Sequence, residues 1–509
     1  YGKGRTADDQ ALLGSLGELP DRDGLETFTA AFDLVIGNPP WTRLRDESPA
    51  RRRAEGAVAG RPKDTASKRA NQAFTAIAKR VLKSRELDDL AKDYTNPDKA
   101  PDIPFLWRAA EWAKPGATIA FAMHARLFLH TQGKKDVTWL AAQKAFTFTG
   151  IINGADLRWT SVWPGIKAPF CLAFAKNQSA TPNHGFYFVT PTCDYEVNNK
   201  GRFRIDYASV NPLRGSELES TPWLLKTLTL GTWLDVEVMK RIQSAFDKSL
   251  EKRWEECPVL STRPSRKGYT LSLGLKQKPA PFLANLKDFE EPDSGRFQID
   301  SSKLKKFIEN HKVASAYRPL EAINYEAPLV IIPKAPGESQ FSPKGFIATT
   351  DTAFSQSYYG YSCKGHPEAE VLAAVIHVLA HSTLARYFVL MRSASLGSDF
   401  MMFLKADFDA IPFPDVAKLS SRQKKSILSL SERLRAGEGI IPKTKDEPSE
   451  DYLLPSFAHE ANSRRNDHDR AKAFWVELND FIFRLYGLTG EDAQVIADTL
   501  YAAAPYRRA

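Results

Sequence analysis

Cysteine is scarce in this 509-residue sequence, and long hydrophobic runs are missing from it. The four cysteines, Cys171, Cys193, Cys257 and Cys363, lie far apart and form no Cys-x-x-Cys pair. This spacing argues against a zinc knuckle and against a disulfide framework, so we expect reduced cysteines that serve as packing residues. No stretch approaches the roughly 18 consecutive apolar residues of a membrane-spanning helix.

Targeting signals are also missing at the start of the sequence. The first twenty residues do not combine a basic start, an apolar run and a cleavage site, and they lack an initiating Met. We therefore expect a cytoplasmic protein without a membrane partner, and a native start that lies upstream of Tyr1. The length predicts two or three domains, and the apolar share of 43% is ordinary for a globular protein.

Positive charge is concentrated in one segment. Between Arg43 and Arg85, 13 Lys and Arg stand against 4 Asp and Glu, a balance of +9 that equals the net charge of the whole chain. A solvated insertion and a phosphate-binding loop both fit this segment, which begins two residues after a predicted strand-end motif. The candidate phosphate contacts within it are Arg43, Arg45, Arg51, Arg52 and Arg53.

Strand and helix signals alternate as far as about residue 180. This alternation predicts an α/β domain with a parallel sheet covered by helices. The continuous apolar run FDLVIG at 32–37 predicts a central strand that is buried on both faces. Ligands of such sheets bind beyond the carboxyl ends of the strands. We expect further strands at 117–123, 147–154 and 170–176, and helices at 101–116 and about 135–145.

The pattern changes along the rest of the chain and predicts four parts. They are an α/β domain at 1–205 with a basic insertion at 43–100, a connecting region at 206–325, an α+β domain at 326–418 and a helical region at 419–509. Strand signals occur at 327–334 and 345–362, and a long amphipathic helix is expected at 368–393. His377 and His381 lie one turn apart on that helix, but without an acidic partner at metal spacing we expect them in the core.

The segment Asn38-Pro39-Pro40-Trp41 follows the strand at 32–37 and carries the chemistry. The exocyclic amine of adenine is a poor nucleophile, because its lone pair is delocalised into the ring. A catalyst must accept both N–H protons as hydrogen bonds, and the Asn38 side chain and the Pro39 carbonyl can do so. The prolines hold both acceptors in place. Trp41 offers a face on which a flipped base can stack.

This motif resembles the signature of N6-adenine DNA methyltransferases, in which Asn-Pro-Pro precedes an aromatic residue. The resemblance implies a Rossmann-like, S-adenosylmethionine-dependent catalytic sheet and double-stranded DNA as the partner. Residues 105–123 and 149–176 are similar to the family's later helix and strands. By position, Trp163 takes the role of an aromatic residue that packs on the flipped base. We expect Asp33 to mark the start of the strand, and a role near the cofactor is the second alternative.

The C-terminal half is similar to the larger members of this family in restriction-modification and phage-defence systems. In those proteins a target-recognition domain of strands and helices follows the catalytic domain. The resemblance rests on the segments around 329–334, 371–391, 393–415 and 477–496. It implies DNA contacts at Lys334, Ser393, Ser395 and Lys405.

The sequence departs from the family in its cofactor motif. The Gly-rich loop that holds S-adenosylmethionine normally precedes the Asn-Pro-Pro strand by many tens of residues, and only 37 residues precede Asn38. The one candidate glycine segment, at 12–24, follows no apolar strand. We therefore expect the cofactor half upstream in a longer protein, on another subunit, or lost.

Three interpretations remain open. The chain is part of an adenine-specific DNA methyltransferase, a non-catalytic DNA-binding specificity module, or a methyltransferase of another amine or amide, such as a protein glutamine or RNA. The match between motif and strand favours the first. The missing cofactor loop keeps the second open, and the basic insertion favours DNA over the third.

Overall fold

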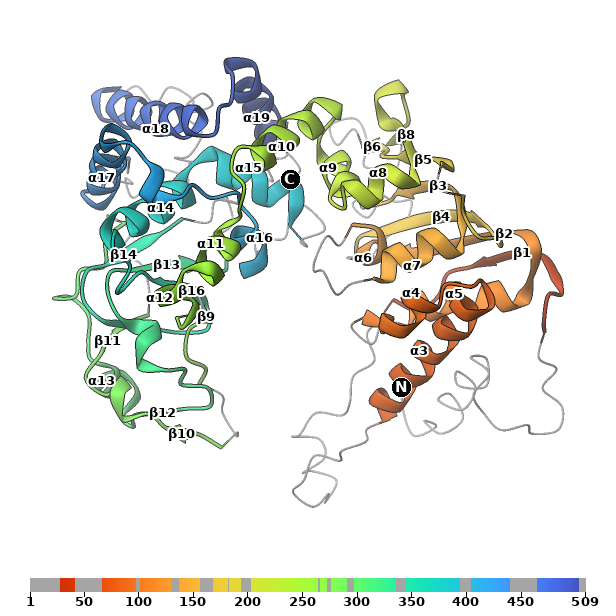
Figure 1. Cartoon of the computed structure of the whole chain (residues 1–509), viewed down its shortest axis with the longest axis horizontal. Helices are drawn as coiled ribbons and strands as arrows, with labels where there is room; N and C mark the ends of the chain where they lie inside the picture. The colour runs from red at the N-terminus through yellow and green to blue at the C-terminus, as the bar shows by residue number, and fades with distance from the viewer. Residues whose placement is uncertain are drawn as a thin grey trace. The chain divides into compact units, whose positions relative to one another are not determined.

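A computed structural model describes the chain at residues 28–41, 66–97, 101–129, 137–155, 168–181, 183–193, 203–263, 266–271, 276–290, 297–335, 344–393, 404–439 and 465–502. The chain divides into two compact units, Tyr1–Thr229 and Leu230–Ala509 (Figure 1). Each unit is described by itself below. The four-part division predicted from the sequence stays a prediction.

The first unit contains a six-stranded mixed sheet in the order β1-β2-β4-β3-β5-β8. β1 runs parallel to β2 and β3 runs parallel to β5, whereas the other three pairs are antiparallel. The prediction of a parallel sheet was therefore wrong, because apolar runs reveal a strand but not its direction. The strands are β1 (Phe32–Gly37), β2 (Ala113–His124), β3 (Thr147–Asn153), β4 (Phe170–Lys176), β5 (Gly185–Val189) and β8 (Val210–Arg214).

Two of the helices that pack on this sheet were predicted, at 101–116 and about 135–145, whereas the helix at 66–84 lies in the segment that was predicted as a basic insertion. The helix α5 (Asp102–Trp112) packs on β2 and on α3 (Ala66–Ser84), and α7 (Thr138–Ala145) packs on β3. Figure 1 shows α3, α5 and the short α4 (Asp88–Asp93) together beside β1 and β2. The side chains of Ile119, Phe121 and Met123 in β2 are buried. These contacts form the core of the first unit.

β1 lies at the edge of the described sheet, which corrects the expectation of a central strand. Among the described strands it pairs with β2 alone. Two of its apolar side chains, Leu34 and Ile36, are 52% and 72% exposed. Leu34 pairs with Thr118 and Ile36 with Ala120, so all four share one face of the sheet. This face lacks the cover that an apolar strand normally receives.

The second unit contains a four-stranded antiparallel sheet in the order β14-β13-β16-β9. Its strands β13 (Leu329–Pro333), β14 (Phe346–Ala348) and β16 (Tyr358–Ser362) fall within the two predicted segments, which confirms those predictions. The fourth strand, β9 (Arg266–Lys267), comes from the region that was expected only to connect domains. Apolar residues of this sheet and of the preceding loops form one buried cluster that includes Leu283 and Phe354.

The predicted helix at 368–393 is two helices, α14 (Ala369–His381) and α15 (Thr383–Arg392), bent by 68°. The bend occurs at Ser382, whose side chain caps α15 by accepting the N–H of Ala385 at 3.1 Å. Both helices are buried along most of their length, so the amphipathic assignment was wrong. Within the described residues no single helix is long and apolar enough to cross a membrane. The bent pair α14 and α15 has the length and composition of a membrane span only when both helices are taken together.

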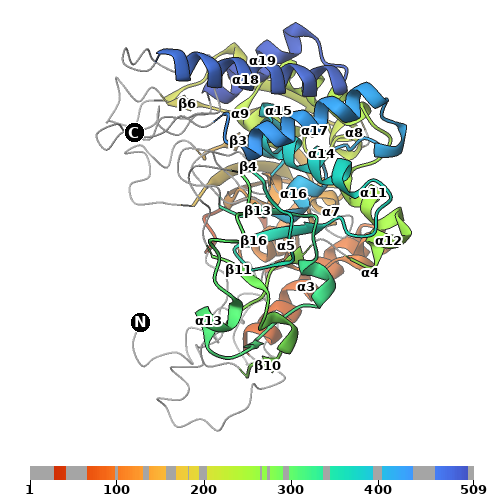
Figure 2. The same ribbon diagram turned by 90° about the vertical axis from the view of Figure 1, so that its left-hand side faces the viewer.

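The C-terminal region is helical, as predicted. It contains α17 (Ser421–Arg435), α18 (Arg465–Leu485) and α19 (Gly490–Ala502), and Figure 2 shows α17 alongside α14.

One buried carboxylate joins three helices of this unit. Asp235, in α10 (Trp233–Ser244), accepts hydrogen bonds from the hydroxyls of Tyr387 at 2.9 Å and Thr499 at 2.6 Å.

His377 and His381 lie in the core of the second unit, as the sequence predicted. The Nδ1 of His377 lies 3.0 Å from the hydroxyl of Ser431, and the Nε2 of His381 accepts the N–H of Gly345 at 3.0 Å. Burial lowers the pKa of His377 well below its ordinary value and lowers the pKa of His381 to about 3. Both rings are therefore neutral in the folded protein at neutral pH.

We predict that acid destabilises the second unit through these histidines. Because their folded pKa values lie below the unfolded value near 6.5, their contribution to stability is full above pH 6.5 and declines as the pH falls. Each histidine then removes up to about 1.4 kcal/mol from the free energy of unfolding per pH unit. Denaturant unfolding between pH 7 and pH 5 measures this slope, which the variant His377→Gln/His381→Gln should reduce. An unchanged slope in that variant would contradict the prediction.

Candidate functional site

The Asn-Pro-Pro-Trp segment emerges at the carboxyl end of β1, where the sequence placed it. Asn38 is exposed, and its side chain makes no hydrogen bond to any other described residue. Pro39 is buried, whereas Pro40 is exposed. Gly37 precedes them, and a Cβ there would lie 2.7 Å from the Phe121 ring, so only glycine fits this approach of β1 to β2. The result is an amide held on a fixed backbone and open to a ligand.

Trp41 is fixed at three points. Its indole N–H donates to the carbonyl of Ala122 in β2 at 3.0 Å. Its own carbonyl accepts from Nη2 of Arg126 at 2.9 Å. Its ring stacks on Phe170, with 5.7 Å between the centroids and 17° between the planes. The ring remains half-buried, and its orientation is set by β2 and β4.

Phe170 is a site residue that the sequence did not reveal. It is buried at the first position of β4, and its backbone carbonyl accepts the N–H of Gly154 at 2.8 Å. A Cβ on Gly154 would lie 2.3 Å from the Phe170 ring. The ring therefore packs between Gly154 and Trp41. An aromatic residue that starts an apolar strand is too common a signal to have identified it.

Three polar residues behind the motif were also missed. Asp102 begins α5, His124 ends β2, and Arg126 begins the short helix α6 (Arg126–Leu129). The carboxylate of Asp102 accepts the backbone N–H of His124 at 3.2 Å, and Arg126 contacts Trp41 as described. These residues lie 60 or more positions beyond the motif, so the sequence gives no sign that they are near it in the fold.

Asp33 lies at the amino end of β1. Its exposed carboxylate forms an ion pair with the ammonium of Lys114 at 2.9 Å. Asn38 follows it by five positions, and at about 3.3 Å per strand residue this is roughly 16 Å. A role for Asp33 near a cofactor stays a prediction.

Two of the predicted DNA contacts lie close together in the second unit. The ammonium of Lys334 lies 5.6 Å from the ring centroid of Tyr359, and the backbone of Lys405 interacts with the Tyr359 hydroxyl. Burial, and then the nearby charge of Lys267, lower the pKa of Lys334 to about 8. Lys405 is paired with the buried carboxylate of Asp409, which offsets its charge. Contact with DNA stays a prediction for both lysines.

Ser393 does not offer its hydroxyl to a ligand in this structure. It is 1% exposed, at the end of α15, and its Oγ has no hydrogen-bond partner among the described residues. A DNA contact at Ser393 stays a prediction. The remaining predicted site residues lie outside the described residues. They are the DNA contacts Arg43, Arg45, Arg51, Arg52, Arg53 and Ser395, the base-stacking residue Trp163, and the candidate cofactor segment at 12–24.

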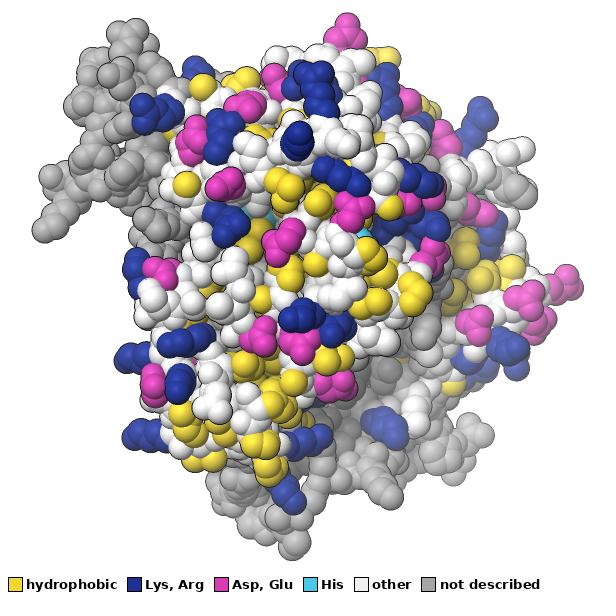
Figure 3. All heavy atoms as spheres, turned by 60° about the vertical axis from the view of Figure 1, so that its left-hand side comes forward, with side chains coloured by type: hydrophobic (Ala, Val, Ile, Leu, Met, Phe, Trp, Pro, Cys, Tyr) yellow, Lys and Arg dark blue, Asp and Glu magenta, His cyan; other side chains and the backbone are white. Residues whose placement is uncertain are grey.

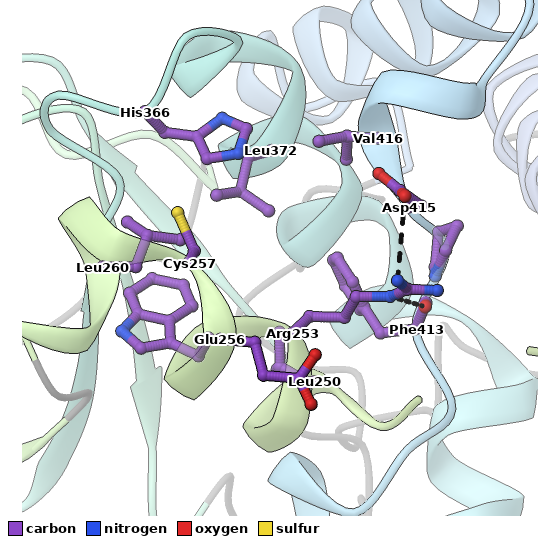
Figure 4. A pocket seen from close by; sticks show the side chains of 12 residues that line it. Leu250, Arg253, Glu256, Cys257, Leu260, His366, Leu372, Phe413, Asp415 and Val416 are labelled. Carbon is purple, nitrogen blue, oxygen red and sulfur yellow. Dashed lines mark hydrogen bonds and ion pairs between the residues drawn. The ribbon is translucent and has the colours of Figure 1, made fainter. Parts of the chain in front are cut away.

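A groove in the second unit has a cavity volume of about 230 Å³ and lies between α11 (Leu250–Glu256), α12 (Pro258–Ser261) and the segment around Phe413 (Figure 4). Arg253 lines it, donates from Nε to the Phe413 carbonyl at 3.2 Å, and lies 3.7 Å from Asp415. Its charge is thus offset inside the groove. On the face shown in Figure 3, basic and acidic side chains are likewise interspersed.

One group of possible metal ligands occurs among the described residues. Side-chain atoms of Asp288, Glu290 and His311 lie within 4.8 Å of one another. Asp288 already accepts the hydroxyl of Tyr269 at 2.9 Å, and it also accepts the side-chain N–H of Asn310 at 3.1 Å. His311 lies 2.8 Å from the same carboxylate. These bonds make the buried Asp288 the centre of a polar network, which fits a structural role, whereas Glu290 is exposed.

The described residues do not fit the main binding loop for S-adenosylmethionine. Within them, no strand leads through a Gly-x-Gly turn into a helix. The carboxyl end of β1 leads into Asn38, and that of β2 leads into His124. These strand ends therefore carry an amide and an imidazole side chain, not a glycine turn.

No family model and no curated protein matches the sequence. Several solved structures are similar to the chain. The type IIL restriction-modification enzyme MmeI in complex with DNA is 12% identical over 92% of this chain and 56% of its own, with a TM-score of 0.46. A DrdV–DNA complex is 12% identical, with the same coverage and a TM-score of 0.34. A nuclease-deletion mutant of the type ISP restriction-modification enzyme LlaGI, with a DNA substrate mimic, is 10% identical over 81% and 36%, with a TM-score of 0.37. The chain thus spans about half the length of the first two proteins.

We predict that Gly154→Ala disturbs the stack of Phe170 on Trp41. The new methyl group would overlap the Phe170 ring, and overpacking of this kind costs about 1 to 3 kcal/mol. Thermal unfolding measures the loss. Gly150→Ala, in β3 just before Gly154, is the matched control, because its Cβ would meet only the Tyr187 carbonyl at an ordinary 3.7 Å. Equal stability of the two variants would show that the Phe170 ring adjusts freely.

Proposed function

We propose that this chain handles the target base in an adenine-specific DNA N6-methyltransferase of a restriction-modification or phage-defence system. The observation that carries the proposal is the Asn-Pro-Pro-Trp segment at the carboxyl end of β1. There Asn38 is exposed, and Trp41 is held from behind by β2 and β4. This combination suits recognition of a planar base that carries an amino group.

The acceptor chemistry follows from Asn38 and Pro39. The Asn38 side-chain oxygen accepts one N–H of the adenine amine, and the Pro39 carbonyl accepts the other. Two accepted hydrogen bonds draw the nitrogen lone pair out of conjugation, so the nitrogen becomes nucleophilic. Because Asn38 has no hydrogen bond to another described residue, its oxygen need not be released from a protein partner first.

Trp41 provides the aromatic ring on which the flipped base stacks. Stacking of a base on an aromatic ring contributes about 1 to 3 kcal/mol, which offsets much of the cost of unstacking. Phe170 and the bond from Trp41 to the Ala122 carbonyl keep the indole plane fixed. A fixed ring loses little freedom on binding, which favours affinity.

The methyl donor would be S-adenosylmethionine, bound mainly by groups outside the described residues. The free edge of β1 and the exposed face at Leu34 and Ile36 are where a cofactor-binding segment would extend the sheet. A parallel strand added there would have its carboxyl end beside Asn38. This placement would bring donor and acceptor to one edge of the sheet.

We predict that Asn38→Ala abolishes methyl transfer and leaves DNA affinity nearly intact. The change removes one of the two acceptors for the amine but no phosphate contact. Transfer of radiolabelled methyl groups to unmethylated genomic DNA by the full-length protein measures activity, and fluorescence anisotropy with a short duplex measures affinity.

Asn285→Ala is the matched control for Asn38→Ala, since Asn285 is exposed in the other unit. A wild-type protein that binds DNA without transferring methyl groups would favour a non-catalytic specificity module. Transfer to protein or RNA but not to DNA would favour the methyltransferase of another amine. Either result would contradict the proposal.

We predict that changing Arg51, Arg52 and Arg53 to Ala weakens DNA binding and flattens its dependence on salt. Three lost phosphate contacts reduce the slope of log affinity against log salt by roughly 2 to 3. The control is Lys240, Lys248 and Lys252 changed to Ala, which removes the same charge from lysines that pair with glutamates. Equal effects of both triple changes would indicate a response to net charge alone.

A further inference from the structure

The segment between β5 and β8 carries two exposed apolar side chains just before β8 begins. Tyr207 is 98% exposed, and Ile205 is 47% exposed. Tyr207 is the first residue of the 3₁₀ turn η3 (Tyr207–Ser209), which leads directly into β8. Nearly the whole surface of a large aromatic side chain is therefore open to solvent at this turn.

The backbone of this turn is fixed. Asp206 caps η3, because its Oδ1 accepts the N–H of Ser209 at 3.1 Å and the hydroxyl of Ser209 at 3.0 Å. The Ser209 carbonyl accepts the N–H of Thr190 at 2.8 Å, which ties the turn to the end of β5. The short antiparallel strands β6 (Thr192–Cys193) and β7 (Phe203–Arg204) pair just before it in the chain. The exposed ring is thus presented by a defined turn.

The turn and the Asn-Pro-Pro-Trp segment leave the sheet at the same edge. β1, β2, β3 and β5 run in one direction, and β4 and β8 run in the other. Strand pairing forms one row across the whole sheet, which consists of Gly37, Phe121, Ala173, Ile151, Phe188 and Asn211. Asn38 follows the first residue of this row, and η3 precedes the last one on the same side. Figure 1 shows β1 and β8 at opposite ends of the sheet.

The distance between the two positions suits a DNA duplex. The six strands leave five spacings of about 4.8 Å, or roughly 24 Å in total. Double-stranded DNA rises by about 3.4 Å per base pair, so this distance corresponds to roughly seven base pairs. A duplex whose target base reaches Asn38 would therefore also pass η3. Because each strand of a sheet is turned by about 20 to 25° from the next, Tyr207 would meet that duplex from its side, at a groove.

The side chains of the turn also suit a groove. Apolar side chains such as Ile bind in the minor groove and insert at base steps. A Tyr hydroxyl and an Arg guanidinium both donate to phosphate oxygens. Arg204 is 77% exposed, and its Nε pairs with Asp206 at 3.0 Å, so it stands beside the apolar residues on the same turn.

We propose that Tyr207, together with Ile205 and Arg204, contacts duplex DNA roughly seven base pairs from the target base. The choice of DNA as the partner rests on the proposed function, because it follows from the edge that this turn shares with Asn38. The other partner that an exposed aromatic turn could take is a second copy of this chain. The tests below distinguish the two partners.

The first test is DNA affinity, measured by fluorescence anisotropy of the full-length protein with a mixed-sequence duplex of about 40 base pairs, long enough to span both positions. Tyr207→Ala should lower the affinity by roughly 5- to 50-fold, as expected for one lost aromatic contact. It should leave the slope of log affinity against log salt unchanged, because no charge is removed. Tyr207→Phe should restore most of the affinity, since the ring remains.

Tyr187→Ala is the matched control for Tyr207→Ala. Tyr187 is 57% exposed, but it lies in the middle of β5 and not at the edge of the sheet. This variant should bind DNA as the wild type does. Wild-type affinity in Tyr207→Ala, or an equal loss in both variants, would overturn the proposal.

The second test is photocrosslinking from the same two positions. Tyr207→p-benzoylphenylalanine should crosslink to the duplex on illumination, whereas Tyr187→p-benzoylphenylalanine should not. A crosslink from position 207 to a second protein chain, with none to DNA, would identify self-association and overturn DNA as the partner.

Methyl transfer, measured in parallel, separates this inference from the proposed function. Transfer to DNA by the wild type, with unchanged affinity in Tyr207→Ala, would contradict the role of Tyr207 and leave the proposed function standing. A loss of affinity in Tyr207→Ala, in a protein that transfers no methyl groups, would support that role and contradict the proposed function.

Discussion

The antiparallel pairing of β2 with β4 is the interaction on which the candidate site depends. Its register runs from Thr118 opposite Lys176 to His124 opposite Phe170. This register places the end of β2 beside the start of β4, so the Ala122 carbonyl and the Phe170 ring both meet Trp41. A shift of one residue would turn Phe170 to the other face of the sheet. The orientation of the motif is thus a property of the whole sheet.

Local segments of the fold could be predicted from the sequence. The runs at 32–37 and 170–176 coincide with β1 and β4, because short continuous apolar runs with distinct flanks predict strands, although only β4 is largely buried. The helix expected at 101–116 ends earlier, at Trp112, since β2 already begins at Ala113. There the backbone pairs with Phe32 of β1, and this tertiary contact overrides the Pro-Gly signal at 115–116.

Features that arise from contacts between distant segments could not be predicted. The order and direction of the strands, and the edge position of β1, are set by pairing that a single sequence does not reveal. The same holds for the site, where Asn38 and Trp41 were found from a local motif but Phe170 and Arg126 were not. Ser393 shows the converse. A polar residue in a loop-like sequence suggested the surface, yet the end of α15 is packed inside the unit.

Among the described strands, β1 has one unpaired edge, and this edge links the assembly of the protein to its lifetime. A strand edge with exposed Leu34 and Ile36 is a template for pairing with another chain, and a unit that stays open there is prone to self-association. A segment that covers this edge binds only the folded sheet, and therefore stabilises it by an amount that grows with the logarithm of the segment's concentration. Molecules that remain uncovered are left to aggregation and proteolysis. The abundance of the protein would thereby depend on whether this edge is covered.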